Sequence, residues 1–263
     1  MKLCSIASGS SGNCIYVGSN DTNILIDVGI SKKRIEEGLK TIDIDPTTIS
    51  AILITHEHTD HIAGLGVMSR KHNIPIYGTK ETLDCVLGMA KLGKISNDLF
   101  NYIKPNESFN IQDIRINSFS IFHDASNPVG YTLEANDRKI GIATDLGKYD
   151  ENIINQLKDS DILFIEANHD ENMLLVGSYP YYLKQRILGE LGHLSNEASA
   201  DLISSLISDK YQYITLAHLS KENNYDKLAY ETIFSQLTAM GCDFSKLCLN
   251  VAEKDFPSEL VII

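Results

Sequence analysis

The residues best suited to chemistry are gathered in one short run, residues 56–61, with the sequence HEHTDH. Side chains two apart in an extended loop point the same way, so His56 and His58 can bind one metal ion together. Asp60 and His61 stand at the start of the next expected helix and can face a second ion close by. Imidazole and carboxylate are the ligands expected for Zn²⁺ or Mn²⁺. The run therefore predicts a metal centre.

Two metal ions need more ligands than this run supplies, and three further residues stand just past apolar runs. They are His123 after residues 114–122, Asp145 after residues 139–143, and His218 after residues 213–217. Ligands in layered α/β folds gather past the carboxyl ends of strands. A single histidine in such a place is more often a surface or capping residue. Because the HEHTDH run is present, we expect all three to be metal ligands.

Strands and helices that position these residues are indicated along the whole chain. Strand-like runs, the last of which closes the chain, are expected at residues 3–7, 14–17, 23–27, 51–55, 114–122, 129–134, 139–143, 161–165, 213–217 and 246–251. Helices are expected at residues 32–40, 62–72, 79–91, 195–207 and 225–240. This alternation favours an α/β (α+β) fold in helix, sheet, sheet, helix layers, although periodicity alone does not select that arrangement.

Length and composition are those of a globular protein. The chain has 263 residues, of which 43% are hydrophobic, and no linker or repeat divides it, so a single domain is expected. It shows no run of about 18 apolar residues and no signal-peptide pattern, which predicts no membrane span. Five cysteines without a CxxC pair indicate no disulfide framework and favour a cytoplasmic location.

The net charge of −12 counts against broad electrostatic binding to nucleic acid. It does not exclude a nuclease, because two bound divalent ions would add about four positive charges locally.

The pattern as a whole resembles the metallo-β-lactamase superfamily, from Asp27 to His218. The resemblance implies a four-layer αββα sandwich, in which two mixed β-sheets are flanked by helices. It implies one metal ion on His56, His58 and His123, another on Asp60, His61 and His218, and Asp145 bridging them. Asp27 resembles the residue that braces the histidine loop. The superfamily's best-known lactamases have cysteine where this chain has Asp145, and a carboxylate there is typical of phosphoesterases.

Several segments resemble one branch of the superfamily, the YycJ/WalJ branch. They are residues 8–13, 123–131, 166–170, 192–198 and 217–224. Members of this branch are similar to RNase Z and RNase J and are described as 5′–3′ DNA exonucleases linked to DNA repair. Only 47 residues separate Asp145 from His193, too few for the β-CASP domain of RNase J. Residues 172–189 are too short for the tRNA-gripping arm of RNase Z.

Hydrolysis of a phosphodiester is the reaction that follows. A hydroxide that bridges two metal ions is expected to attack phosphorus, because metal binding lowers the pKa of water. Asp60 is expected to orient this nucleophile, with acceptance of its proton as a second role. His193 resembles the RNase Z histidine and is expected to donate a proton to the leaving oxygen.

Substrate contacts are less sharply indicated. Candidates near the expected site are His169, Ser220, Asn223 and Asn224. Residues 8–13 either bring backbone N–H groups to a phosphate or form a simple turn. Tyr179, Tyr181 and Tyr182 lie near Lys184 and Arg186 in the sequence. This group either stacks on bases and meets phosphates or packs beneath a loop, and packing is the favoured interpretation.

Other functions stay open at this point. They are a small-molecule (cyclic) phosphodiesterase, RNase Z-like RNA processing, thioester or lactam hydrolysis, and a non-enzymatic signalling partner. A polymer substrate predicts a positive groove leading to the metal ions, whereas a small substrate predicts an enclosed pocket. The choice between Zn²⁺ and Mn²⁺, and between a monomer and a homo-oligomer, is likewise left open.

Overall fold

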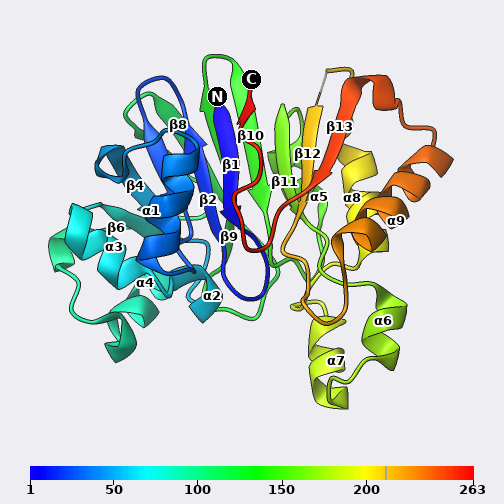
Figure 1. Cartoon of the computed structure of the whole chain (residues 1–263), viewed down its shortest axis with the longest axis horizontal. Helices are drawn as coiled ribbons and strands as arrows, with labels where there is room; N and C mark the ends of the chain where they lie inside the picture. Colours follow the sequence, from blue (N-terminus) through cyan, green and yellow to red (C-terminus); the bar gives the residue numbers. More distant parts are fainter. Residues whose placement is uncertain (211) are drawn as a thin grey trace.

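Two β-sheets pack face to face and carry helices on their outer sides (Figure 1). This computed structural model describes residues 1–210 and 212–263. Within that part of the chain each sheet has seven strands, in the orders β14-β1-β2-β3-β4-β5-β6 and β13-β12-β11-β10-β9-β8-β7. The four-layer αββα sandwich that the family resemblance implies is confirmed.

Both sheets are mixed. The first is antiparallel from β14 to β3 and parallel from β3 to β6, with β1 Lys2–Ala7, β2 Cys14–Gly18, β3 Asn23–Ile26, β4 Ile49–Leu53, β5 Ile76–Thr79, β6 Phe100–Ile103 and β14 Val261–Ile262. The second is parallel from β13 to β10 and antiparallel from β10 to β7, with β7 Ser108–Ile111, β8 Ile114–Ser120, β9 Val129–Ala135, β10 Arg138–Ala143, β11 Ile162–Glu166, β12 Gln212–Ala217 and β13 Leu247–Val251.

Several helices begin where a side chain caps a free backbone N–H group. Ser31, Thr79 and Ser195 accept such bonds at the starts of α1, α4 and α8. The α-helices are α1 Lys32–Thr41, α2 Thr59–Ile62, α3 Leu65–His72, α4 Lys80–Leu87, α5 Glu151–Leu157, α6 Glu171–Val176, α7 Tyr181–Ile187, α8 Asn196–Leu206 and α9 Asp226–Ala239. Short 3₁₀ turns are η1 Pro46–Thr48, η2 Ala90–Leu92, η3 Asn97–Leu99 and η4 Phe244–Lys246.

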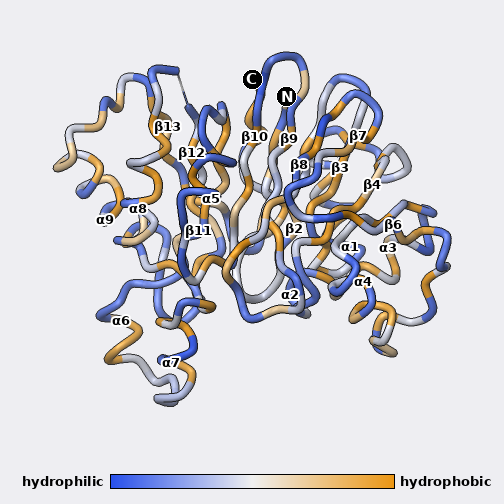
Figure 2. The backbone as a smooth tube through the Cα atoms, turned by 180° about the vertical axis from the view of Figure 1, so that it is seen from behind, coloured by the Kyte–Doolittle hydropathy of each residue, from blue (hydrophilic) through white to orange (hydrophobic). Residues whose placement is uncertain are grey.

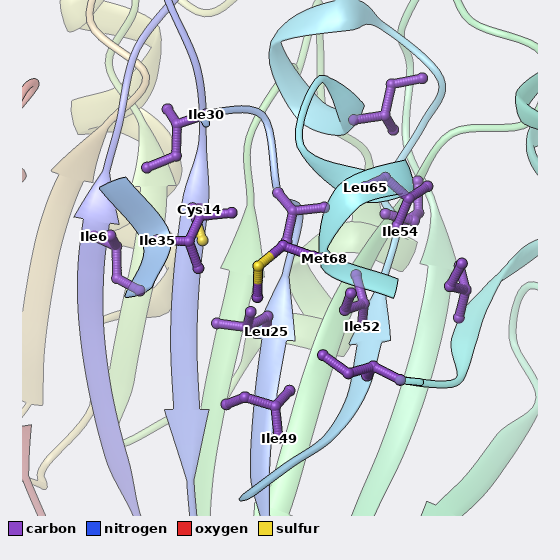
Figure 3. Close-up of a cluster of buried hydrophobic side chains, with 14 of the residues drawn as sticks. Ile6, Cys14, Leu25, Ile30, Ile35, Ile49, Ile52, Ile54, Leu65 and Met68 are labelled. Carbon is purple, nitrogen blue, oxygen red and sulfur yellow. The ribbon is translucent and has the colours of Figure 1, made fainter. Parts of the chain in front are cut away.

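Three apolar layers hold these elements together. On β3, Leu25 belongs to the layer beneath α1 and α3, whereas Ile24 and Ile26 belong to the layer between the sheets. Figure 3 shows the first of these layers, where Ile35 of α1 and Met68 of α3 lie over the sheet. A third layer joins the second sheet to α5, α8 and α9. Since both faces of the central strands are buried, their sequences are almost continuously apolar.

Three of the expected boundaries are wrong. The helix expected at residues 62–72 is two helices, α2 and α3, because Gly64 between them donates its N–H to the carbonyl of Val28 at 2.8 Å. Helix α4 ends at Leu87 instead of continuing to residue 91. Strand β13 does not close the chain, since β14 follows and pairs with β1.

The carboxyl ends of β4, β10 and β12 meet at the edge of the sandwich where α2, α6 and α7 lie, at the bottom of Figure 1. Helices α6 and α7 extend beyond the body, and Figure 2 shows both hydrophobic and hydrophilic residues along them. No helix within residues 1–210 or 212–263 combines the length and apolarity needed to cross a membrane.

Candidate metal centre

Three of the expected site residues lie just past strand ends in a left-handed backbone conformation. Asp27 follows β3 with φ 56°, Asp145 follows β10 with φ 60°, and His218 follows β12 with φ 55°. Residues other than glycine seldom adopt positive φ, and such conformations cluster at functional sites. The structure thus places these side chains at the edge where the loop of residues 56–61 also lies.

A first group of possible ligands consists of His56, His58 and His123. One nitrogen atom from each ring lies within 4.8 Å of the other two. The Nδ1 atom of His58 is 3.2 Å from Nε2 of His123. Tetrahedral Zn²⁺ with bonds of about 2.1 Å holds its ligand atoms about 3.4 Å apart, so this spacing fits a metal ion.

A second group consists of Asp60, His61 and His218. The Oδ2 atom of Asp60 is 3.5 Å from Nε2 of His61 and 3.6 Å from Nε2 of His218. Asp145 lies between the two groups, with Oδ2 at 3.3 Å from His61 Nε2 and Oδ1 at 3.8 Å from His123 Nε2. The seven expected ligands are therefore brought together as two groups joined by one carboxylate.

Polar atoms without partners indicate what these groups are suited to hold. His56 Nε2, His218 Nε2 and Asp145 Oδ2 are buried and have no hydrogen-bond partner. Buried polar atoms in native proteins are almost always hydrogen-bonded, and unsatisfied ones are costly. Since all three belong to the ligand groups, the residues present fit metal ions, which would satisfy them.

Asp27 stabilises the histidine loop through hydrogen bonds. Its carboxylate accepts hydrogen bonds from the Nδ1 atom of His61 at 2.7 Å and from the N–H of Thr55 at 2.9 Å. With Nδ1 occupied, Nε2 of His61 is left for the centre. Burial disfavours a charged ring, but the carboxylates of Asp145 and Asp27 outweigh burial and hold the pKa of His61 above its usual value.

Glu166, which ends β11, is the residue that the sequence analysis did not include in the site. One oxygen accepts from Nδ1 of His193 at 2.9 Å and from Nδ1 of His218 at 2.8 Å. The other accepts backbone N–H groups at 2.8 and 3.0 Å. Burial works against its charge, but the two histidines outweigh burial and hold the pKa of Glu166 below its usual range. Its position at a strand end, as for Asp145, was the available signal.

The loop of residues 8–13 supports the centre. Asn13 donates its N–H to the carbonyl of Asp60 at 2.8 Å, and the Ser8 hydroxyl accepts the N–H of His218 at 2.8 Å. Gly29 packs on the same loop, where a Cβ atom would lie only 1.6 Å from the Asp60 carbonyl oxygen. Only glycine fits there. Of the two interpretations of residues 8–13, the structure supports a bracing turn, and Ser10 also reaches the pocket.

A cavity of about 240 Å³ opens over the two ligand groups. Arg186 is the one Lys or Arg residue that lines it in the described part of the chain, so the lining is not strongly positive. His193 and Ser220 reach this cavity, as expected. The full lining is Ser10, His58, Asp60, His123, Asp145, Asn168, Tyr179, Leu183, Arg186, Ile187, His193, His218 and Ser220.

Three other substrate candidates do not line the cavity. His169 is buried, and neither of its ring nitrogens has a hydrogen-bond partner. Asn223 accepts the N–H of Asp170 through its carbonyl at 2.9 Å, and the Asn224 amide donates to the carbonyl of Ala167 at 3.0 Å. These bonds stabilise the chain before α6. Asn168 lines the cavity but was not among the predicted substrate contacts. Its amide donates to the carbonyl of His218 at 2.9 Å.

The tyrosines of α7 are not packed beneath a loop. Tyr181 is 77% exposed and Tyr182 is 74% exposed, so the favoured interpretation of these two residues is wrong. Tyr179 lines the cavity. The nearby Lys184 donates to the carbonyls of Leu175 at 2.6 Å and Gly177 at 2.7 Å, which ties α7 to the end of α6.

Comparison with known proteins identifies the family of this chain. Residues 22–214 match the family model described as "Beta-lactamase superfamily domain". The chain is 36% identical over 236 residues to "Exodeoxyribonuclease YycJ" of Bacillus anthracis, covering 90% of this chain and 89% of that protein. It is 38% identical over 247 residues to "Exodeoxyribonuclease WalJ" of Streptococcus pneumoniae, covering 92% of each.

Solved structures agree on the fold. Zn²⁺-bound PqqB of Methylobacterium extorquens superposes with a TM-score of 0.73 at 16% identity, covering 98% of this chain and 100% of that one. The metallo-β-lactamase fold protein YhfI of Bacillus subtilis gives 0.71 at 15% identity, covering 98% and 99%. Given the family model and the 36–38% identity to the two exodeoxyribonucleases, the chain belongs to the metallo-β-lactamase superfamily, in the family that includes YycJ and WalJ.

Proposed function

We propose that this protein is a dinuclear metal-dependent phosphodiesterase, and specifically a 5′–3′ DNA exonuclease. The observation that carries the proposal is the pair of ligand groups joined by Asp145, with buried ligand atoms that lack partners. The relatives named exodeoxyribonucleases, 36% and 38% identical over most of the chain, support DNA as the substrate.

The distances within the centre support two ligand sets. One divalent ion would be held by His56, His58 and His123, and the other by Asp60, His61 and His218, with Asp145 shared. All donors are nitrogen or oxygen, which suits Zn²⁺ and Mn²⁺. When bound, two such ions lower the pKa of water and stabilise negative charge on a phosphoryl group.

Asp60 is the proposed orienting residue. Its side chain is 28% exposed towards the cavity, so it can accept a hydrogen bond from an attacking water. Burial opposes its charge, but the neighbouring rings of His218 and His61 outweigh burial and hold its pKa below the usual range.

His193 is the proposed proton donor. Glu166 accepts the Nδ1–H of this ring, so Nε2 is the atom left to carry a proton to the leaving oxygen. Ser220 is kept as a candidate substrate contact because it lines the same cavity.

We also propose that residues 1–263 form one domain without a β-CASP insertion. Between Asp145 and His193 the chain forms α5, β11, α6 and α7, which leaves no room for a further domain. Five cysteines without a disulfide among the described residues favour a cytoplasmic location.

Digestion of DNA tests the proposal. With added Mn²⁺ or Zn²⁺, the protein should shorten a 5′-phosphorylated, end-labelled DNA strand progressively from its 5′ end. His58→Ala should slow this by more than about 100-fold, because loss of a ligand costs at least as much as loss of a residue that orients one. His72→Ala is the matched control, since His72 pairs with Glu36 outside the centre.

Other outcomes identify other functions. Hydrolysis of bis(p-nitrophenyl) phosphate without loss of DNA would move the substrate to a small phosphodiester. Faster digestion of an RNA strand would favour RNase Z-like processing. No hydrolysis of any of these by the metal-loaded protein would overturn the proposal.

A further inference from the structure

Arg186 is the charged residue of the cavity that the proposed mechanism does not use. It lies near the end of α7, and its side chain is 51% exposed. Among the lining residues of the described chain it is the one permanent cation. A nucleic-acid strand carries a phosphate on both sides of the bond that is cut. A cation beside the ligand groups could therefore contact one of these neighbouring phosphates.

The guanidinium of Arg186 is held in a fixed orientation. Its Nη2 donates to Oδ1 of Asp124 at 2.9 Å, and its Nε donates to Oδ2 of the same carboxylate. That Oδ1 atom is in turn 3.5 Å from Nε2 of His123. The carboxylate of Asp124 therefore lies between Arg186 and His123, a member of the first ligand group.

Two of the five N–H donors of this guanidinium are used by Asp124, and the others remain for a ligand. A planar guanidinium with spare donors is well suited to bind phosphate through two parallel hydrogen bonds. The charge of Asp60, across the cavity, adds to that of Asp124 in raising the pKa of Arg186. The side chain is thus charged and lies on the substrate side of the centre.

The neighbouring cation on α7 is placed differently. The ammonium group of Lys184 donates hydrogen bonds to the carbonyls of Leu175 and Gly177, at the end of α6. It does not line the cavity. Of these two cations on α7, Arg186 faces the centre, whereas Lys184 fixes the helix to the end of α6.

We propose that Arg186 binds the phosphate that adjoins the scissile phosphodiester, and that Asp124 orients it to do so. This inference rests on the proposed function, since it concerns a polynucleotide strand. Binding to an adjoining phosphate carries no sequence information, and it positions the strand so that the next linkage lies over the ligand groups. A diester without an adjoining phosphate cannot make this contact.

Strands with one altered phosphate test the contact. The rate of the first cleavage is measured in single turnover for a natural strand, a strand without its terminal phosphate, and a strand with a neutral methylphosphonate at the second linkage. For the protein itself, one of the two altered strands should be cut about tenfold more slowly or worse, as expected for loss of a charge-assisted hydrogen bond.

Arg186→Ala should already cut the natural strand slowly. The phosphate alteration that slows the unaltered protein should change the cleavage rate of this variant by less than about twofold. Arg186→Lys should retain part of the effect, because a cation remains. Arg115→Ala, at an exposed arginine far from the cavity, should keep the full effect. A merely structural role would slow every strand equally and leave the ratio of rates unchanged.

The inference is overturned if Arg186→Ala keeps the ratios of the unaltered protein. It is also overturned if neither altered strand is cut more slowly. Failure of the protein to cut any strand would instead overturn the proposed function, and this inference with it.

Discussion

At the scale of single residues, the centre depends on how imidazole rings are oriented. Glu166 accepts Nδ1–H bonds from His193 and His218 with a single oxygen atom, so both rings present Nε2 to the cavity. Asp27 does the same for His61. Each carboxylate holds a proton on Nδ1. This leaves the Nε2 lone pair of His61 and His218 for a metal ion, and it leaves Nε2 of His193 as the atom that takes up and delivers a further proton.

Glu166→Gln should therefore damage the site without unfolding the protein. A glutamine amide group facing the two rings would donate where they also donate, and this forces both rings to the other tautomer. We expect metal affinity to fall by about 10- to 100-fold and cleavage to fall at least as far. Metal titration and single-turnover rates check this.

The matched control is Glu190→Gln, which removes an exposed carboxylate paired with Lys148. It should leave both metal affinity and rate as they are. Equal metal affinity in Glu166→Gln and the unaltered protein would contradict the bracing role.

Most of the centre could be predicted from the sequence because its residues follow apolar strands directly. His123, Asp145 and His218 carry that signal, and the HEHTDH run carries its own. Glu166 also stands at a strand end, but its role depends on contacts with His193 and His218, 27 and 52 positions away, which no local pattern reveals. Arg186 was noted beside the tyrosines, whereas its pairing with Asp124, 62 positions away, could not be predicted.

At the scale of elements, a charged network ties α1 to α3. The carboxylate of Glu36 on α1 accepts hydrogen bonds from Lys32 at 2.7 Å and, across from α3, from Lys71 at 2.8 Å and His72 at 2.9 Å. The Lys32 and Lys71 bonds, ahead of the opposing effect of burial, lower the pKa of Glu36 to about 2. The folded state thus prefers the charged form.

This sets a direction for pH dependence. Because the pKa of Glu36 is depressed in the folded protein, its stabilisation is complete above the ordinary glutamate pKa of about 4.3. It is lost as the pH falls from there towards about 2. Glu36→Gln should lower the free energy of unfolding by about 1 kcal/mol at pH 7, a value reduced for solvent screening, and by less at pH 3.

Urea unfolding at the two pH values measures this difference. Glu37→Gln is the control, because its exposed pair with Lys33 spans 3.8 Å and should contribute almost nothing. A difference between Glu36→Gln and the unaltered protein that grows on acidification would contradict the network.

The α6–α7 segment presents apolar side chains to solvent beside the cavity. Tyr181 and Tyr182 are exposed at the start of α7, and Val176 at the end of α6 is 86% exposed. Tyr182 precedes Arg186 by four residues, so both lie on one side of the helix. Under the proposed function, these rings are placed to stack on bases of a strand that leaves the cavity.

Replacing both tyrosines by serine should raise the KM for a single-stranded oligonucleotide by roughly tenfold, because one stacked base contributes about 1–3 kcal/mol. The kcat should change far less, since neither ring belongs to the ligand groups. Tyr102→Ser, at an exposed tyrosine on β6, should change neither value. A fall in kcat at constant KM would argue against stacking.

The strands that pack on both faces could be predicted from the sequence, since their apolar runs are long. Short or polar elements could not. Strands β5, β6 and β7 have four residues each, and β14 has two. Their pairing with neighbouring strands, and not their own composition, makes them strands.

At the scale of the whole molecule, the centre joins the two sheets. His56, His58, Asp60 and His61 follow β4 of the first sheet, whereas His123, Asp145 and His218 follow β8, β10 and β12 of the second. Each ligand group contains residues from both sheets. Metal binding is therefore coupled to the stability of the sandwich.

Removal of metal should lower the Tm. An ion present at 100 times its Kd stabilises by about 2.7 kcal/mol, and a chain of this size shifts by about 2–4 °C per kcal/mol. A chelator should thus lower the Tm by at least about 5 °C in scanning calorimetry. Asp145→Asn, which alters the shared carboxylate, should be much less sensitive to the chelator. An unchanged Tm after metal content has fallen to zero would contradict the coupling.

The ligands lie at one edge of the sandwich. At the opposite edge the hydroxyls of Ser19 and Thr22, in the turn after β2, donate hydrogen bonds to the carboxylate of Asp113, in the turn before β8. The two sheets are therefore joined by these hydrogen bonds at one edge and, when metal is bound, by shared ligands at the other. Removal of metal loosens the second edge, so slow opening motions should then have their largest amplitude in the loops of the centre. Binding of an ion thus changes where the protein moves as well as how tightly it is folded.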